Sequence, residues 1–451
     1  MASAAEQFVS SLNFSSIAKA TELKQRIWFT LGALIVFRLG THIPLPGIDP
    51  FVMEQIFKQN AGGILGLFNM FAGGAVQRMA IFALGIMPYI SASIIIQIMT
   101  AISKELEALK KEGEMGRKKL NQYTRYLTLG LAVIQAYAIA LGLEGMAGGG
   151  GASVVVDPGW FFRITTVITL TGGTMFLLWL GEQITSRGIG NGISLIILAG
   201  IVAGLPAAFA STLEMARTGA LSTVLLLGLL VMVVVIITFI VYMERAQRRL
   251  VVQYPKRQVG LKQFDGSSTH LPIKINSANV IPPIFASSLL LLPATALGFS
   301  ANSADAPEWL QWVSANLQHG QPTFMILYGL LIIFFCFFYT AIQMNPDDTA
   351  DNLKKGGGFI PGIRPGKNTS DYIDYVMTRL TVVGAAYLTA VCLFPELLIS
   401  QMPGVPFYLG GTSILIAVSV TMDTVSQIHS HLIAHQYEGL IKKAKLRGSR
   451  R

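Results

Sequence analysis

The chain has 451 residues, of which 13% are charged and 52% are hydrophobic, and its mean hydropathy is +0.55. A soluble domain carries about 25% charged residues. The composition therefore excludes an ordinary soluble protein and indicates a polytopic membrane protein. The net charge of +10 does not by itself indicate nucleic-acid binding, because the cytosolic loops of membrane proteins concentrate Lys and Arg.

Apolar runs of about 20 residues are long enough to cross a bilayer as helices. The chain contains ten of them, at residues 27–43, 80–102, 126–143, 164–180, 193–213, 221–243, 280–299, 324–344, 380–399 and 407–425. Continuous runs of this length favour helices over the strands of a barrel. We predict an all-α bundle of ten transmembrane helices. The amino-terminal stretch MASAAEQFVSSLNFSS lacks the apolar core and cleavage site of a removable signal, so we expect the first helix to be retained.

The basic residues predict the orientation. Most of the 34 Lys and Arg residues fall in segments that lie on one side if ten helices alternate, namely 1–26, 104–125, 187, 245–274, 354–379 and 442–451. The positive-inside rule places this side and both termini in the cytosol. We therefore divide the chain into a cytosolic segment 1–26, a first half 27–213 with five spans, a second half 221–425 with five, and a basic tail 426–451.

Two halves of five spans have opposite orientations. Any internal duplication would consequently be an inverted repeat, with two pseudo-symmetric halves around a midplane site. The sequence is compatible with such a repeat and does not demonstrate it. Several spans are interrupted by proline, which removes backbone hydrogen bonds that neighbouring protein or a water-filled cavity must replace. These prolines are Pro88, Pro206, Pro282, Pro283 and Pro395.

The motifs of common catalytic and metal sites are incomplete. His431 and His435 are one helical turn apart, but no Glu follows the first His as a zinc protease requires. GIGNG at 188–192 lacks the spacing of a dinucleotide fingerprint, and we interpret it as a tight cytosolic turn. The segment around Lys367 lacks both the first Gly and the Ser or Thr of a phosphate loop. We expect no ATP site, no metal and no cofactor, so any work must come from outside the chain.

Charge inside the spans is sparse. Arg38 and Asp423 are the deepest charged residues, and both lie near helix ends where they can reach the interface. The cysteines Cys336 and Cys392 lie in apolar runs and are expected to be small buried hydrophobes. Two alternatives remain open on residues alone. A secondary transporter would use the interrupted helices around a polar midplane site, and an intramembrane enzyme would need a nucleophile and base, of which we find no plausible pair.

Three segments do not fit a plain bundle. The stretch GGILGLFNMFAGG, Gly62 to Gly74, spans roughly 20 Å as a helix, against about 30 Å of bilayer hydrocarbon. Its five glycines make it a weak helix, so it is an interfacial loop or a short re-entrant segment. The loops at about 244–279 and 345–378 are long, basic and rich in Gly and Pro. They are either solvated linkers or a docking surface for a large partner.

Several long motifs indicate the family to which these segments belong. In chain order they are IPLPGID (43–49), FNMFAGGA (68–75), IFALGIMPYISASIIIQ (81–97), KKEGE (110–114), QYTRY (122–126), WLGEQIT (179–185), RGIGNGIS (187–194), NPDDTADNLKK (345–355) and PGIRPG (361–366). With these motifs the chain resembles the bacterial SecY family, the channel subunits of the general protein translocon, from the first span to the basic tail. The resemblance implies a passive channel, not an enzyme, that passes unfolded preproteins across the membrane and releases membrane helices sideways into lipid.

The resemblance also implies a closed pore. In the family a short half-helix, the plug, folds into the channel from outside, and here it maps to about residues 61–74. The plug residues are Gly62, Gly63, Ile64, Leu65, Gly66, Leu67, Phe68, Asn69, Met70 and Phe71. A ring of apolar side chains closes the midplane beneath it. The ring positions are Ile86, Ile90, Ile197, Ile284 and Ile416. Branched apolar side chains suit such a ring because they wet poorly and deform around a passing chain.

Two further sites are implied by the same resemblance. The sideways exit, or lateral gate, lies between the second and seventh spans, and its residues are Ser91, Ser93, Ile94, Ser287 and Ser288, with Asn276 nearby. A motor or ribosome docks on the cytosolic loops, at Lys256, Arg257, Lys262, Lys354, Lys355 and Arg364. In the family an Arg at the PGIRPG position is needed for motor-driven transport. Relatives commonly carry paired Arg where this chain reads Leu261 and Lys262, so one cation is missing.

The expected partners follow from the family. They are the small membrane subunits SecE and SecG, the SecA ATPase motor, the translating ribosome, the signal sequences of preproteins, anionic lipids, and the accessory proteins SecDF and YidC. The expected location is the bacterial cytoplasmic (inner) membrane, as a multi-pass protein.

Overall fold

The computed structural model describes residues 21–59, 69–145, 153–219, 222–254, 257–259, 262–264, 268–290, 321–401 and 410–448. Within these ranges, seven helices are long and apolar enough to cross a membrane, and two shorter apolar helices, Met87–Ile102 and Ile281–Leu290, accompany them. Together with the helix Thr21–Gly40, a helix lies in the described part of each of the ten predicted runs. The helical membrane bundle predicted from the sequence is confirmed.

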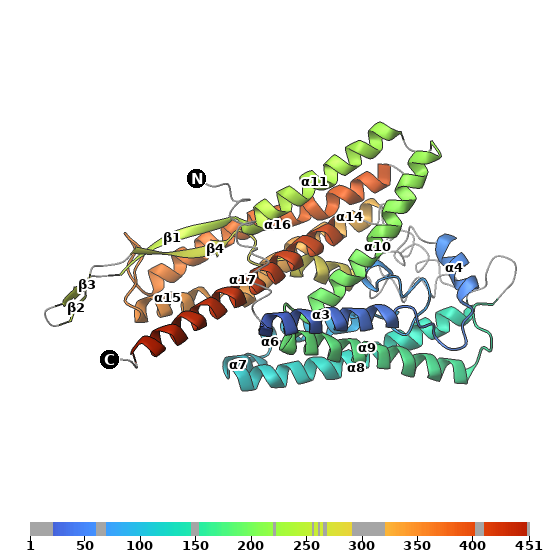
Figure 1. The fold of residues 1–451 in the computed structure, drawn as a ribbon, viewed down its shortest axis with the longest axis horizontal. Coiled ribbons are helices and arrows are strands. Elements are labelled where there is room, and N and C mark those ends of the chain that lie inside the picture. The colour runs from blue at the N-terminus through green and yellow to red at the C-terminus, as the bar shows by residue number, and fades with distance from the viewer. Residues whose placement is uncertain are drawn as a thin grey trace.

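The described residues of the first half form both long and short helices. They are α3 (Thr21–Gly40), α4 (Pro50–Gln59), α6 (Met87–Ile102), α7 (Lys104–Lys111), α8 (Glu114–Gly145), α9 (Trp160–Arg187) and α10 (Gly192–Arg217). In Figure 1, α3, α6, α8 and α9 run side by side, and α10 crosses toward the second half. The predicted turn at GIGNG is present between α9 and α10. Asn191 ends it by accepting hydrogen bonds from the backbone N–H groups of Ile193 and Ser194, which caps α10.

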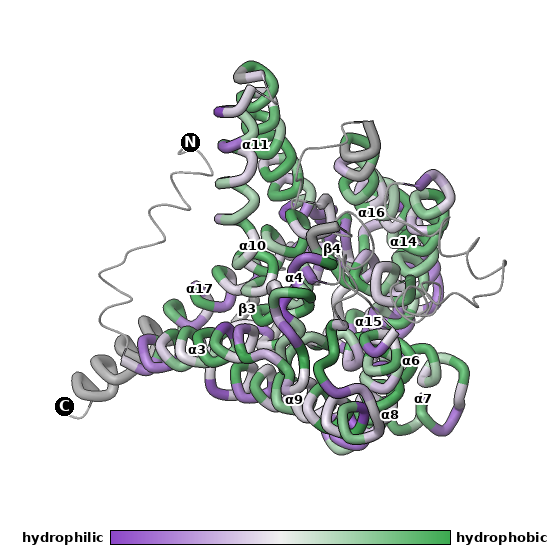
Figure 2. Tube along the Cα trace, turned by 90° about the vertical axis from the view of Figure 1, so that its right-hand side faces the viewer, coloured by the Kyte–Doolittle hydropathy of each residue, from purple (hydrophilic) through white to green (hydrophobic). Residues whose placement is uncertain are grey.

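The second half comprises the remaining helices. They are α11 (Thr223–Arg245), the helix Ile281–Leu290, α14 (Pro322–Gln343), α15 (Pro346–Lys355), α16 (Lys367–Gln401) and α17 (Gly411–Gly448). α16 packs against both α14 and α17. α11 is hydrophobic along nearly its whole length (Figure 2), yet only 6% of its most apolar window is buried within the chain. Such a helix has an apolar surface that only lipid or another membrane helix can cover.

A small β structure stands outside the bundle, which the sequence did not predict. β1 (Gln247–Gln253) pairs antiparallel with β4 (Ser268–Lys274), in a register that runs from Gln247 opposite Lys274 to Gln253 opposite Ser268. Between them, β2 (Arg257–Val259) pairs with β3 (Lys262–Phe264). Figure 1 shows these strands, α15 and the carboxyl end of α17 at one end of the molecule, and α4 at the other. The loops predicted to be cytosolic therefore gather at a single end.

Several boundaries differ from those predicted. The second apolar run was predicted to be helical from residue 80, but α6 begins only at Met87, and residues 81–86 form turns. Gly85 adopts a φ of +55° there, and Pro88 occupies the first turn of α6. α16 begins well before its apolar run because polar residues from Lys367 onward continue the helix into the basic loop. The segment predicted as a basic tail is likewise helical, because α17 continues to Gly448.

Candidate functional site

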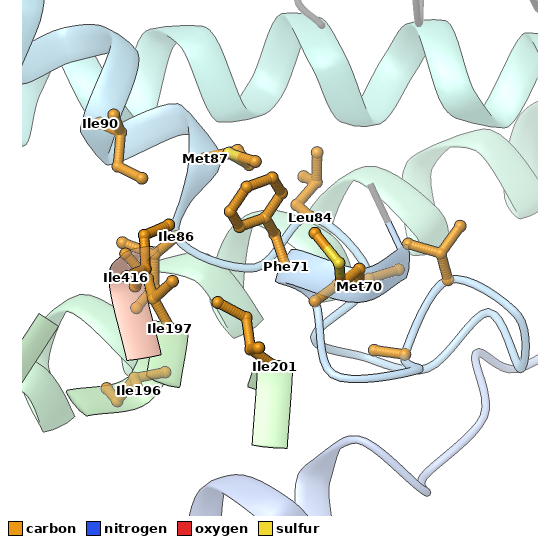
Figure 3. Packing of buried hydrophobic residues seen from close by; sticks show 14 of the residues in the cluster. Met70, Phe71, Leu84, Ile86, Met87, Ile90, Ile196, Ile197, Ile201 and Ile416 are labelled. Carbon is orange, nitrogen blue, oxygen red and sulfur yellow. The ribbon is translucent and has the colours of Figure 1, made fainter. Parts of the chain in front are cut away.

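Isoleucines from three helices meet at the centre of the bundle. Ile86 and Ile90 come from the start of α6, Ile197 from α10 and Ile416 from α17, and all four are at least 94% buried. Figure 3 shows Ile86, Ile197 and Ile416 grouped together, with Ile90 one turn farther along α6. Ile284, the fifth predicted ring residue, is partly buried and packs against the same core. The structure thus brings Ile86, Ile197 and Ile416 together, whereas for Ile284 it shows only packing against the larger core of the bundle.

The local sequence explains why α6 contributes two of these side chains. Ile86 is the N-cap residue, with φ −98° and ψ 1°, and Pro88 fixes the first turn. Ile90 follows Ile86 by four residues and so lies on the same helix face. Its backbone N–H donates to the Ile86 carbonyl over 3.1 Å. The turns before Met87 therefore determine where this part of the ring sits.

The carboxyl end of the predicted plug packs on this cluster. Asn69, Met70 and Phe71 form a single helical turn and are buried, whereas the predicted plug residues 62–68 lie outside the described part of the chain. Phe71 borders a narrow apolar cavity together with Ile86, Ile90 and Ile197. The Ser413 hydroxyl of α17 donates to the Met70 sulfur at 2.9 Å. The end of the plug segment thus contacts both halves of the chain.

The helix Ile281–Leu290 contacts α6 where the resemblance implied a lateral gate. The Ser288 hydroxyl donates to the sulfur of Met87 over 3.7 Å, and both residues are buried. The other predicted gate residues that are buried are Ser91, Ile94 and Ser287. Ser93 is half-buried and accepts a hydrogen bond from Gln97 on its own helix. Between the described residues of these two segments, the one side-chain hydrogen bond observed is this weak contact to sulfur.

At the predicted cytosolic end, α7 bridges the same two halves. The ammonium group of Lys110 donates to the backbone carbonyl of Ile342, in the last turn of α14, over 3.1 Å. A cation at the carboxyl end of a helix satisfies a carbonyl that has no partner within the helix. On the exposed face of α7, the hydrogen bond from Lys111 lowers the pKa of the Glu107 carboxyl. Lys110 thus spans the two halves at the end of the molecule nearest the β structure.

The two long basic loops form one unit (β1, β4, α15 and the start of α16), which we call the cytosolic platform after the side of the membrane predicted for it. Gln253 and Phe359 exchange two backbone hydrogen bonds, of 2.9 and 3.0 Å, which joins the first loop to the second. Side chains from both loops share a small core of Leu250, Ile273, Ile360, Ile373, Val376 and Met377. Gly358 permits this approach, since a Cβ there would lie 3.0 Å from both Tyr254 and Val252. The loops are therefore packed structure and not solvated linkers.

Arg364 lies in an exposed turn of this platform. Its neighbours Gly362 and Gly366 adopt φ values of +83° and +109°, and its carbonyl accepts the Thr369 hydroxyl over 2.9 Å. Lys354 and Lys355 are exposed in the last turn of α15. Of the other predicted docking residues, Arg257 and Lys262 are in β2 and β3, where the structure describes only the backbone, and Lys256 lies outside the described residues.

Met87 and Ser413 were missed by the sequence analysis, although both contact predicted sites. Helical spacing could have indicated Ser413, because it lies one turn before Ile416 on α17. The charges flagged in the spans do not form a midplane site: Arg38 is half-buried at the end of α3, and Asp423 is exposed. Within the described residues, no group of three or more His, Cys, Asp or Glu is placed to hold a metal.

An apolar cluster between two helical halves, with the buried turn Asn69–Phe71 packed against it, fits a membrane channel. The fold agrees with that class. A solved protein-conducting channel superposes with a TM-score of 0.62 at 17% identity, covering 90% of this chain and 92% of that one. The canine Sec61 of a ribosome-channel complex superposes with a TM-score of 0.60 at 16% identity, over 90% and 92%.

The sequence comparisons define the family. The SecY family model matches residues 80–425. The protein translocase subunit SecY of Escherichia coli K12 is 56% identical over 427 residues, covering 95% of this chain and 96% of the relative. The corresponding subunit of Rickettsia conorii is 54% identical over 435 residues, covering 96% and 99%. The chain belongs to the SecY family.

Proposed function

We propose that the isoleucine cluster and the segment around Met70 are the gate of this chain, a protein-conducting channel of the SecY family and not an enzyme. The observation that carries the proposal is the meeting of Ile86, Ile197 and Ile416, from three separate helices, beside Phe71. Isoleucine side chains offer no hydrogen bond to water or ions, so a constriction that they line stays dry. Moving the helices apart widens it without breaking any polar contact among those side chains.

The transported chain is an unfolded preprotein, and hydrophobic segments leave sideways into lipid. The contact between Met87 and Ser288 supports this second route, because a weak hydrogen bond to sulfur is lost at small cost. A signal sequence is itself apolar and can replace the contacts that the two helices lose. A secondary transporter is not favoured, because the ring positions are apolar and offer no ligand for a solute.

Translocation needs an external motor, and Arg364 is its principal contact on the cytosolic platform. Its exposure on a turn held by Thr369 supports this assignment, because a fixed tip loses little entropy on docking. The guanidinium offers a fork of donors for a carboxylate, a phosphate or a backbone carbonyl. The proposed partners are the SecA ATPase and the translating ribosome on the platform, SecE and SecG beside the bundle, signal sequences at the gate, anionic lipids, and SecDF and YidC as accessory proteins.

The chain is a multi-pass membrane protein, and we place it in the bacterial inner membrane with both termini in the cytosol. The gathering of the basic loops at one end supports this orientation (Figure 1). The domain division follows from it, with residues 27–213 and 221–425 as the halves around the gate.

Reconstitution tests the proposed function. The channel complex is placed in vesicles, and the entry of an unfolded preprotein is compared with that of a labelled small solute. We expect the preprotein to become protected from protease only when motor and ATP are supplied, while the solute stays outside. Uptake of the solute without preprotein transport would indicate a transporter instead.

A further inference from the structure

A buried polar pair joins the end of α11 to the segment that leads into the helix Ile281–Leu290. The Asn276 amide nitrogen donates to the Glu244 carboxylate over 2.7 Å, and both residues are buried. Glu244 lies in the last turn of α11. A carboxylate is costly to bury unless its oxygens accept hydrogen bonds, so this contact carries weight in the fold. The sequence analysis noted Asn276 only as a neighbour of the sideways exit and did not single out Glu244.

The same amide nitrogen also holds the turn that follows. It donates to the Asn279 carbonyl over 3.1 Å, and Asn279 has a φ of +52°, in the left-handed region that asparagine adopts more readily than most residues. Both partners of the amide are acceptors, so only its nitrogen can face them. Its oxygen has no hydrogen-bond partner among the described residues. One side chain thus links the end of α11 to the turn before the helix Ile281–Leu290.

Backbone contacts hold this segment from two other sides. The N–H of Ile275 donates to the Ala246 carbonyl over 3.1 Å, which continues the β1–β4 ladder by one bond. α16 lies against the opposite group of the same residue, because a Cβ built on Gly384 would be 3.0 Å from the Ile275 carbonyl oxygen and 3.6 Å from the Asn276 Cα. The segment before the helix is therefore held by α11, the β1–β4 pair and α16.

The start of the helix itself has weaker hydrogen bonding. Pro282 and Pro283 have no backbone N–H to donate. The N–H groups of Ile281 and Ile284 each donate over 3.4 Å, which is longer than the usual range of about 2.7–3.2 Å. One turn beyond Ile284, the helix reaches α6 through the Ser288 hydroxyl. The anchored turn therefore contributes more to the position of this helix than the first backbone bonds of the helix do.

We propose that Glu244 is a positioning residue for the sideways exit: through Asn276 it fixes the turn from which the helix Ile281–Leu290 starts, and so holds Ser288 against Met87. Without an acceptor at position 244, the turn gains freedom and the contact with α6 forms in a smaller fraction of molecules. A defective signal sequence, which offers less apolar surface, then opens an exit that the parent keeps closed. This inference rests on the proposed function and adds a residue outside the exit that determines its geometry.

Glu244→Leu tests the proposal, with Glu244→Gln as the matched control. Leucine fills a similar volume and accepts no hydrogen bond, whereas glutamine keeps an oxygen for the Asn276 amide. Motor-driven transport into inverted vesicles is measured for one preprotein with a normal signal sequence and one with a defective signal. The readout is the ratio of defective-signal to normal-signal transport, because a purely structural loss of channel lowers both and leaves their ratio unchanged.

We expect the ratio to rise several-fold in Glu244→Leu and to stay at the parental value in Glu244→Gln. A parental ratio in Glu244→Leu would overturn the positioning role. An equal rise in both variants would overturn it as well, because the retained acceptor would then make no difference.

Reversing the pair provides a second, independent test. Asn276→Asp places one carboxylate against another, so the ratio should rise. Adding Glu244→Gln to that variant lets the glutamine amide donate to the new carboxylate, which restores the hydrogen bond in the opposite direction, and the ratio should fall back toward the parent. A double variant no closer to the parent than Asn276→Asp alone would overturn the pairing. If Glu244→Leu fails to assemble, the reversed pair decides the question.

Ser277→Ala controls for changes in the same segment, since the Ser277 hydroxyl donates to the Lys274 carbonyl over 3.1 Å and not to Glu244. We expect the parental ratio, and a rise equal to that of Glu244→Leu would overturn the specific role of Glu244. The parent channel separates this inference from the proposed function. Failure of the parent to transport the normal preprotein would overturn the proposed function, whereas normal transport with equal ratios in all variants would overturn only the role of Glu244.

Discussion

The proposed gate and the cytosolic platform are stabilised by different kinds of interaction. In the gate, Ile86, Ile197 and Ile416 pack as apolar side chains with no hydrogen bond among them. In the platform, Gln253 and Phe359 share two backbone hydrogen bonds above a common apolar core. Apolar packing is non-directional and can re-form around another apolar surface, whereas a backbone ladder is satisfied in a single register. Under the proposed assignments, one chain combines a pore that yields with a docking surface that does not.

The largest effect is expected from a change that alters the platform and leaves the gate unchanged. We expect Arg364→Glu to abolish ATP-dependent preprotein transport, because the charge that would meet the motor is reversed on an exposed turn. Transport is measured as protease-protected preprotein in inverted vesicles. Arg364→Lys should also reduce transport strongly, because an ammonium lacks the fork of the guanidinium. Expression and resting conductance should stay normal, and parental transport by Arg364→Glu would overturn the docking role of Arg364.

The reverse change alters the gate and leaves the platform intact. Ile86→Ser with Ile197→Ser should let ions and water through the resting channel and increase its conductance several-fold, since hydroxyls wet a constriction that isoleucine keeps dry. Planar-bilayer recordings check this. Binding of the motor to the same variant should be unchanged, because the platform has its own core. A conductance equal to that of the parent would show that these residues are ordinary packing.

Deleting Gly62 to Gly74 should have a smaller effect on the fold than on closure. Among the described residues, the deletion removes the Met70 and Gly73 contacts but no part of a spanning helix. We expect stable protein in the membrane, a raised resting conductance and weaker discrimination against defective signal sequences. Pulse-chase stability and transport of a preprotein with a defective signal measure these effects. Rapid degradation without a leak would instead make the segment structural.

The smallest effect should come from the ion pair that joins the end of α8 to the start of α9. The Glu144 carboxylate accepts two hydrogen bonds from the Arg163 guanidinium, of 2.6 and 2.8 Å, and one from the Gly159 N–H. Glu144→Gln keeps the shape and removes the charge. We expect a decrease of a few degrees in the thermal unfolding midpoint and no change in conductance or transport. A raised conductance would show that this pair also controls the gate.

The sequence alone was enough to determine the helical membrane bundle, because apolar runs of membrane length permit little else when every backbone group must be bonded within the bilayer. It also determined the family, through motifs that extend from the first span to PGIRPG. The buried state of Cys336 and Cys392 was likewise predicted correctly from their apolar surroundings.

The tertiary structure decided which residues from different parts of the chain are in contact. Isoleucines at ring positions look like any core isoleucine in sequence, and only packing brings Ile86 to Ile197 and Ile416 across three helices. The sequence did not predict the β1–β4 pairing or the backbone bridge between Gln253 and Phe359, because polar strands in a basic loop carry little periodic signal. The contacts at Gly73 were equally hidden, since a hydrogen bond from Arg38 and the close approach of Gly200 join residues far apart in the chain. Local sequence patterns indicate the environment of a segment and the periodicity of its secondary structure, whereas such contacts depend on the positions of whole helices.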